Sequence, residues 1–122
     1  MLGYVTIGVS DLEKAQQFYD ALFAEVGAKQ TFSLDRIKFY GTGDGPMVAI
    51  CTPWDKDEQN SGNGNMFAIA GDGPEGVKKL YDRAIELGAT CDGEPGQRAP
   101  FFYGAYVRDA DDNKICFYEM KT

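Results

Sequence analysis

The sequence predicts an α+β fold made of two tandem β-α-β-β-β modules. Three observations lead to this prediction. The 122 residues repeat at an offset of 62, which sets Tyr19 against Tyr81. Each half carries one amphipathic helical pattern that ends at a glycine, and after each helix the apolar period changes from 3.6 to about 2. A repeat of this length indicates that one supersecondary unit has been duplicated.

The first half begins with a strand over residues 4–9, followed by a helix. Ser10 and Glu13 form a capping box, in which each side chain accepts a hydrogen bond from a free backbone donor of the first turn. Gly27 is expected to end the helix in a left-handed conformation. The positions between them that recur at helical spacing form one apolar stripe: Ala15, Phe18, Tyr19, Leu22 and Val26.

The second half repeats this order with a strand over residues 66–70 and a second helix. Pro74 is a favourable first-turn residue, and Gly88 marks the expected end of the helix. The apolar stripe of this helix consists of Val77, Leu80, Tyr81, Ala84 and Leu87. Both stripes are predicted to pack in a core.

Three strands are expected after each helix, because alternating apolar segments are separated by turn residues. They cover 31–35, 37–40 and 47–52 in the first half, and 90–91, 103–108 and 114–120 in the second. Turns are expected around Gly93, Pro95 and Gly96 and at 109–113. The modules are assigned to 1–54 and 65–122, with a polar linker at 55–64. A small sheet with one helix buries little area, so the two modules are predicted to share one domain.

Two motif-like segments are interpreted as turns. Residues 41–45 are rich in glycine but lack the spacing of a nucleotide-binding loop and lie between strands rather than before a helix. Residues 109–113 begin like a calcium loop. Lys114 occupies the position of the required glycine, and Met120 occupies that of the bidentate glutamate.

Composition excludes several classes of function. The chain is 43% hydrophobic and carries a formal charge of −7, which disfavours nucleic acids and anionic membrane surfaces as partners. No apolar run approaches the length of a membrane span, and the first nine residues do not resemble a signal peptide. Three widely spaced cysteines, Cys51, Cys91 and Cys116, indicate free thiols. We therefore expect a soluble cytoplasmic protein.

The sequence contains no histidine. Imidazole is the usual general base near neutral pH and the commonest nitrogen ligand of transition metals. Ser-His-Asp and Cys-His catalysis and imidazole-based zinc sites are therefore excluded. Any catalysis would use carboxylates, Tyr, Cys, Lys or a cofactor.

Four segments carry a resemblance to a known family: YVTIGVSDL at 4–12, GNGNMFA at 62–68, GEPGQR at 93–98 and YGAYVRDADDNKI at 103–115. Together with the duplicated modules, they resemble the vicinal oxygen chelate superfamily, which includes glyoxalase I, extradiol dioxygenases, and fosfomycin- and bleomycin-resistance proteins. The resemblance extends over nearly the whole chain and is closest to small bacterial glyoxalase-like members. It implies one U-shaped mixed sheet with the helices outside and the site in the concave trough.

Strand alternation predicts which side chains line that trough, because successive residues point to opposite faces. Arg98, in the loop expected before the seventh strand, is a candidate anchor for a carboxylate or phosphate, and a solvated loop arginine explains it equally well. The loop aromatics Trp54, Phe101 and Phe102 fit closure of the trough, a dimer contact or core packing. The predicted ligand-binding residues are Tyr4, Tyr40, Met47, Met66, Arg98, Tyr106, Cys116 and Tyr118.

The resemblance also locates the positions from which relatives bind a metal. Carried over by position, they are Tyr4, Ala49, Met66 and Cys116. Phenol, methyl, thioether and thiol groups differ from the family's usual histidine, glutamine and glutamate ligands, and hard divalent ions prefer oxygen and imidazole. We therefore predict neither a metal nor another cofactor.

Three classes of function remain open. The first is a metal-free protein that binds a small, partly apolar or aromatic molecule. The second is a lyase or dioxygenase-type enzyme with an atypical site, for which Cys116 and Tyr4 are the catalytic candidates and Tyr118 a further candidate acid. The third is a non-catalytic protein whose trough is filled by its own side chains. A homodimer is compatible with each class.

Overall fold

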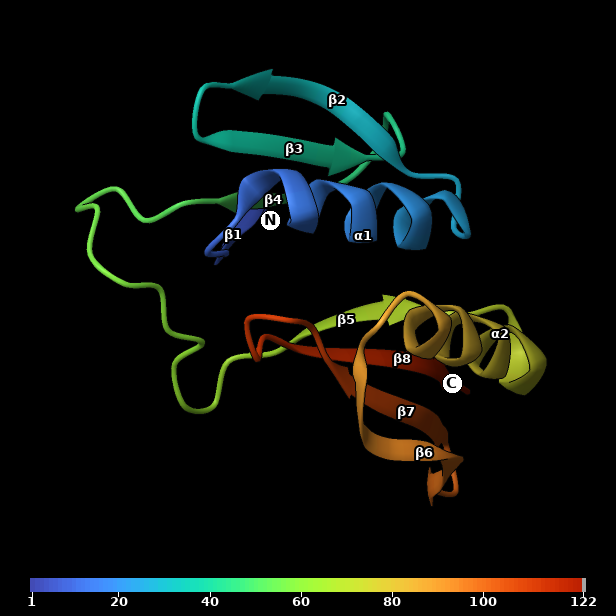
Figure 1. Ribbon diagram of the computed structural model, residues 1–122. Helices are drawn as coiled ribbons and strands as arrows, with labels where there is room; N and C mark the ends of the chain where they lie inside the picture. The colour runs from blue at the N-terminus through green and yellow to red at the C-terminus, as the bar shows by residue number, and fades with distance from the viewer. Residues whose placement is uncertain (122) are drawn as a thin grey trace. The chain divides into compact units, whose positions relative to one another are not determined.

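In the computed structural model, which describes residues 1–121, eight strands and two helices alternate as β-α-β-β-β twice. Residues 1–61 form one compact unit, and the chain from Gly62 onward forms the other. Figure 1 shows the first unit in blue to green and the second in yellow to red. The predicted α+β class and the two tandem modules are confirmed.

The first unit is a mixed four-stranded sheet in the order β1-β4-β3-β2, with α1 packed on β2, β3 and β4. The pairing of β1 with β4 is parallel, and the other pairings are antiparallel. Its elements are β1 (Tyr4–Gly8), α1 (Leu12–Ala24), β2 (Lys29–Leu34), β3 (Ile37–Gly41) and β4 (Met47–Cys51).

The second unit repeats this topology in the order β5-β8-β7-β6, with α2 packed on β6, β7 and β8. Here β5 and β8 form the parallel pair. Its elements are β5 (Phe67–Ala70), α2 (Gly73–Glu86), β6 (Thr90–Ala99), β7 (Phe102–Arg108) and β8 (Lys114–Met120). Within residues 1–121, neither helix has the length and apolar character needed to span a membrane.

The start of α1 differs from the predicted capping box. Asp11, not Ser10, is the N-cap, and its carboxylate accepts a hydrogen bond from the backbone N–H of Lys14 at 3.1 Å. A carboxylate at this position also interacts favourably with the positive end of the helix dipole, an advantage that the serine hydroxyl lacks. The predicted stops are confirmed, because Gly27 and Gly88 follow the helices with φ of 75° and 106°.

Strand β6 is longer than predicted. Gly93, Pro95 and Gly96 lie inside it rather than in a turn, and its pairing with β7 shifts register at three places. Bulges of this kind accommodate glycine and proline in an edge strand, where not every backbone N–H needs a ladder partner. Arg98 therefore belongs to a strand and not to a loop.

Each helix covers one face of its own sheet, and the core of each unit lies between that helix and that sheet. Tyr19 and Leu22 of α1 are buried in the first unit, and Val77, Leu80 and Ala84 of α2 are buried in the second, as the helical stripes predicted. Phe23 of α1 is buried as well, although it lies outside the predicted stripe. The fully buried positions on the strands of the second unit are Ala105, Val107, Ile115, Cys116 and Phe117. The sheet face that α2 leaves open carries the partly exposed aromatic residues described below.

The acidic segment 109–113 forms the turn between β7 and β8, as predicted. One carboxylate oxygen of Asp109 accepts hydrogen bonds from the backbone N–H groups of Asp111 and Asn113, both at 2.9 Å. The other accepts from the side-chain amide of Asn113 at 3.0 Å. Asp109 and Asn113 are both buried, so these contacts make the turn a structural element that fixes the start of β8.

Candidate functional site

One sheet face of the first unit, opposite α1, is apolar. Phe39 lies at its centre, in edge-on contact with Tyr4 at 5.0 Å and stacked on Phe32 at 4.6 Å between ring centroids. Both flanking rings are about half exposed. We call this the first-unit face; its residues are Tyr4, Phe32, Phe39, Met47, Ala49 and Cys51, the last three lying along β4.

Tyr40 was predicted to line the trough, but it does not lie on the first-unit face. Its ring packs against Phe23 of α1 at 5.1 Å, and its hydroxyl donates a hydrogen bond to Asp20 at 2.6 Å. Burial, followed by the bond to Asp20, raises the pKa of Tyr40 well above its ordinary value. Its role in this structure is to join α1 to the sheet.

The second unit has an aromatic face opposite α2. Phe102 of β7 and Tyr118 of β8 are nearly parallel, with 5.7 Å between ring centroids. Gly104 lies across from Tyr118, and a Cβ at this glycine would come within 2.8 Å of the Phe102 ring. The glycine therefore leaves space that the Phe102 ring occupies. We call this the second-unit face; its residues are Arg98, Phe102, Gly104, Tyr106, Cys116 and Tyr118.

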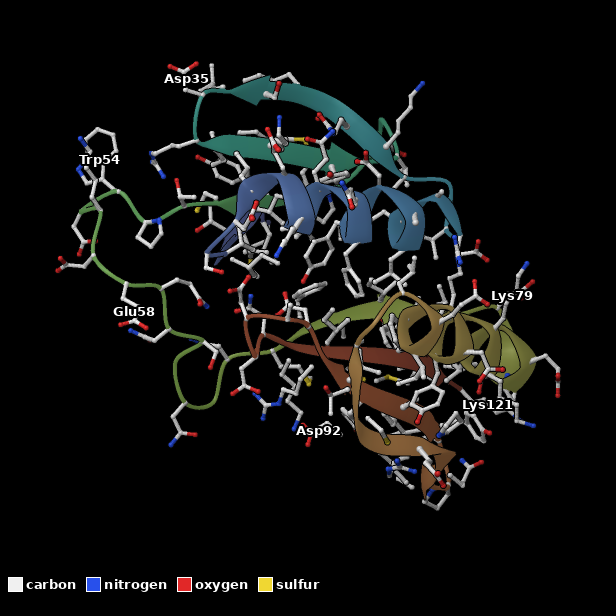
Figure 2. All side chains as sticks on the ribbon, in the orientation of Figure 1. Asp35, Trp54, Glu58, Lys79, Asp92 and Lys121 are labelled. Carbon is white, nitrogen blue, oxygen red and sulfur yellow. The ribbon has the colours of Figure 1, made fainter. Side chains whose placement is uncertain are left out.

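Two cations lie against the ring of Tyr106 on the second-unit face. The guanidinium carbon of Arg98 is 5.5 Å from the ring centroid, and the ammonium of Lys114 is 5.2 Å from it. Asp92, labelled in Figure 2, forms ion pairs with Lys114 at 3.6 Å and with Arg108 at 3.0 Å. Three cations and one carboxylate thus lie together here, so this part of the surface is positively charged although the chain as a whole is acidic.

Cys116 of β8 lies directly across from Tyr106 of β7 and is fully buried. Burial raises the pKa of the thiol, although the hydroxyl of Tyr106, Lys114 and Arg98 each act in the opposite direction. The pKa of Tyr106 is also raised, first by burial and then by its neighbour Cys116. A protonated, inaccessible thiol is a poor nucleophile. The geometry gives Cys116 a structural role.

The positions that correspond to the family's metal ligands do not fit a divalent ion. Tyr4 and Ala49 belong to the first-unit face, Met66 precedes β5 and is half exposed, and Cys116 is buried. Their donor atoms, one phenol, one thioether and one thiol, do not match the oxygen and imidazole preference of hard cations. Within residues 1–121, no three Asp, Glu or Cys side chains are grouped so that they could hold a metal ion.

Several residues of these faces escaped the sequence prediction. Lys114 shares strand parity with Cys116 and Tyr118, so the alternation of β8 could have indicated it. Phe102 was expected in a loop but begins β7. Phe39 carried no separate signal, because β3 is buried on both faces and so shows no polar alternation. Phe32 lies on β2, which is mostly exposed, and its pairing with Phe39 is a contact between strands that alternation within β2 does not reveal.

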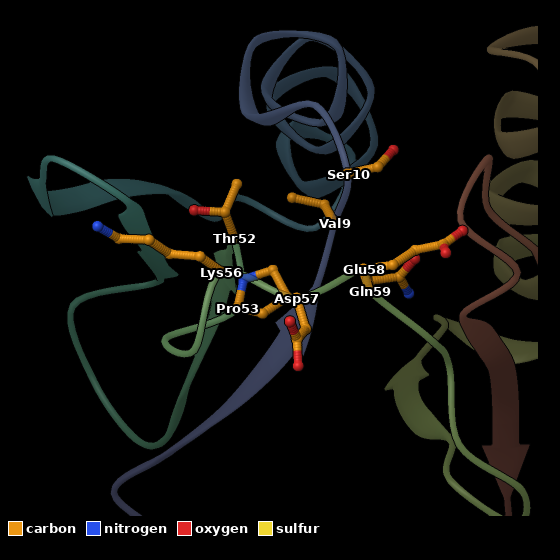
Figure 3. A pocket seen from close by; sticks show the side chains of 8 residues that line it. All are labelled: Val9, Ser10, Thr52, Pro53, Lys56, Asp57, Glu58 and Gln59. Carbon is orange, nitrogen blue, oxygen red and sulfur yellow. The ribbon is translucent and has the colours of Figure 1, made fainter.

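A separate cavity of about 330 Å³ lies beside the start of α1 in the first unit (Figure 3). It contains none of the predicted site residues. Val9 and Ser10 come from the segment before the helix, and the remaining lining residues are Thr52, Pro53, Lys56, Asp57, Glu58 and Gln59. Its charged lining residues are Lys56, Asp57 and Glu58, and nothing in this lining indicates a particular ligand.

Sequence and structure comparisons agree on the family. The model of the Glyoxalase/Bleomycin resistance protein/Dioxygenase superfamily matches residues 1–117. The chain belongs to this superfamily. The resemblance seen in the sequence is thus confirmed, and the shared fold is that of the vicinal oxygen chelate proteins.

Solved structures of superfamily members cover almost the whole chain. A glyoxalase/bleomycin resistance protein from Albidiferax ferrireducens T118 is 32% identical over 99% of both chains, with a TM-score of 0.90. A family enzyme from Burkholderia phytofirmans PsJN is 21% identical over 98% of both chains, with a TM-score of 0.80. The fosfomycin resistance protein FosX from Mesorhizobium loti is 21% identical over 99% of this chain and 92% of its own, with a TM-score of 0.73. No curated protein sequence matches significantly.

Proposed function

We propose that this superfamily member binds a small, partly apolar or aromatic molecule on the second-unit face without using a divalent metal. The observation that carries the proposal is the parallel pair Phe102 and Tyr118, set beside Gly104 and followed along the strand by Tyr106. The three rings are only partly buried within their unit. They therefore retain apolar area that a ligand could cover.

The chemistry of this face favours a planar ligand. Aromatic rings interact with one another best in offset-stacked or edge-on arrangements, and each such contact adds about 0.5–1.5 kcal/mol beyond the area buried. The hydroxyl of Tyr118 and the cations around Tyr106 supply a few polar groups for orientation. A mainly aromatic surface with few polar groups is typical of small-molecule sites.

The donor groups of the chain support binding without a divalent metal. Tyr4, Met66 and Cys116 stand where the family resemblance places ligands, and none offers a carboxylate or imidazole. No observation favours a lyase or dioxygenase reaction over binding, because Cys116 is buried and Tyr4 has no neighbouring base among its described contacts. We therefore assign the face a binding role.

Titration with 2-naphthamide, a neutral planar probe, tests this function by NMR of the aromatic side chains. We expect saturable shifts of the Phe102, Tyr106 and Tyr118 ring signals. Tyr118→Ala should weaken binding at least fivefold, because it removes one ring of the stacked pair. Trp54→Leu is the control, because Trp54 is 81% exposed and belongs to the other unit.

Two outcomes would contradict the proposal. One is the absence of shifts at these rings up to the solubility limit of 2-naphthamide, which would favour a face filled by its own side chains. The other is equal binding of cyclohexanecarboxamide, a saturated analogue, because a site built for stacking should discriminate against it.

A further inference from the structure

Arg98 is held in one position by the backbone of its own strand. Its Nη2 donates a hydrogen bond to the carbonyl oxygen of Glu94 at 2.6 Å, and the guanidinium lies over the ring of Tyr106. Two glycines make room for it. A Cβ at Gly96 would be 2.8 Å from Nη1, and a Cβ at Gly93 would be 3.3 Å from Nη2. The glycines and bulges of β6 therefore place this guanidinium against the aromatic face.

The charge of Arg98 is not matched by a carboxylate. Among residues 1–121, no Asp or Glu oxygen forms an ion pair with it, whereas Arg108 pairs with Asp92 at 3.0 Å and Arg83 pairs with Glu86. A guanidinium has five N–H donors, and one bond to a carbonyl uses only one of them. The others are available for a ligand, since the side chain is exposed.

The local balance of charge favours a single negative charge in the ligand. Arg98, Arg108 and Lys114 contribute three positive charges, and Asp92 and Asp112 remove two of them. Among the described residues, the carboxylate of Glu94 forms no ion pair with any of these three cations, and only its backbone oxygen bonds Arg98. One positive charge is left, in a chain whose formal charge is −7. A phosphate monoester, with about −1.5 to −2 at pH 7, would exceed it.

We propose that the ligand of the second-unit face is a planar aromatic monocarboxylate, with its rings against Tyr106 and Tyr118 and its carboxylate bound by Arg98. This inference rests on the proposed binding function. The planar fork of a guanidinium matches the two oxygens of a carboxylate, and a lysine ammonium does not. The specificity thus comes from Arg98, and the aromatic rings supply the surface.

The test compares 2-naphthoate with 2-naphthamide, which has the same shape and no charge. Wild-type protein should bind the carboxylate about tenfold more tightly, as a charge-assisted hydrogen bond at a half-open site allows. Arg98→Met should remove this preference, so that 2-naphthoate and 2-naphthamide bind with about the same affinity. Arg98→Lys should restore only part of it, because charge returns without the fork.

Arg36→Met is the matched control. Arg36 also donates to a backbone carbonyl, that of Thr52 at 2.9 Å, and also lies over an aromatic ring, that of Trp54 at 5.0 Å. It belongs to the first unit, so its loss should leave the preference for 2-naphthoate intact. The salt dependence of binding tests the same point on the wild-type protein. Raising NaCl from 0.05 to 0.5 M should weaken 2-naphthoate binding to wild type and not 2-naphthamide binding.

The outcomes separate this inference from the function on which it rests. Equal binding of the two probes to wild type, without salt dependence, overturns the inference and leaves the proposed function standing. A preference for 2-naphthoate that survives in Arg98→Met, or is lost in Arg36→Met, overturns the role of Arg98. Tighter binding of 2-naphthyl phosphate than of 2-naphthoate overturns the monocarboxylate class. Binding of none of the probes overturns both proposals.

Discussion

At the scale of single residues, burial decides which reactive groups can act. Cys116 has the chemistry of a nucleophile, but it is fully buried and its pKa is raised by that burial. Cys91 is exposed on β6, and its side chain shares a hydrogen bond with the hydroxyl of Tyr81. That bond, followed by burial, raises the pKa of Tyr81 to about 12. Cys116, the thiol that the sequence indicated as a catalytic candidate, is therefore the least accessible of the three in the fold.

This difference predicts the order in which the thiols react. With iodoacetamide at pH 8, followed by peptide mass spectrometry, Cys91 should be alkylated first, and Cys116 should stay unmodified until the protein unfolds. Complete labelling of all three thiols in urea provides the control. Rapid alkylation of Cys116 in the folded protein would contradict its burial and would return it to the list of catalytic candidates.

At the scale of secondary structure, β7 and β8 form the candidate site because their register sets alternate residues on one face. Tyr106 lies opposite Cys116, and Gly104 lies opposite Tyr118. The buried turn at Asp109 holds this register. The absence of a side chain at Gly104 is as much a part of the face as the rings beside it.

Gly104→Ala tests this contribution. The new methyl group would be 2.8 Å from the ring of Phe102, closer than carbon atoms approach, so the ring must shift from the position in which it stacks on Tyr118. We expect at least a fivefold loss of 2-naphthamide binding and a decrease of about 1 kcal/mol in the free energy of unfolding. Gly3→Ala, where a Cβ meets nothing within 4 Å, is the control. Unchanged binding by Gly104→Ala would show that the stacked pair is not the contact surface.

At the scale of the whole molecule, stability should depend on alkaline pH. The pKa values of Tyr40, Tyr106 and Cys116 are raised in the folded chain, chiefly by burial. The folded state therefore retains protons that the unfolded state releases above about pH 8.5 for the thiol and pH 10 for the phenols. Their contribution to stability is complete below these values and is lost as pH rises through them.

Urea unfolding between pH 8 and pH 11 measures this loss. We expect the free energy of unfolding to be constant, for these groups, up to about pH 8.5 and then to fall. Tyr40→Phe should be less stable at pH 8, because Asp20 loses a hydrogen bond, and should lose about 1 kcal/mol less than wild type between pH 10 and 11. A parallel pH profile for Tyr40→Phe and wild type would contradict the assigned shift. Homodimerisation stays a prediction at this scale.

Local patterns in the sequence determined most of the secondary structure and the sheet face on which several candidate residues lie. The 62-residue repeat, the helical stripes and the glycine stops are visible because each depends on a few neighbouring residues. Strand alternation likewise placed Tyr4 with Met47, and Tyr106 with Cys116 and Tyr118, on the faces where they occur. The absence of histidine excluded imidazole chemistry without any structure.

Tertiary structure decided where non-local contacts override these patterns. Tyr40 faces α1, where its ring packs against Phe23. The sequence could not show this, because β3 is buried on both sides and lacks the polar alternation that assigns side chains to a face. Pairing with β7 makes a bulged strand of a segment whose glycines and proline predict a turn, and that strand carries Arg98 to Tyr106. The sequence by itself determined the fold and the apolar stripes of its helices. Only packing between strands distant in sequence decided which thiol is buried and which cation lies against the aromatic face, because burial and proximity are properties of contacts and not of spacing.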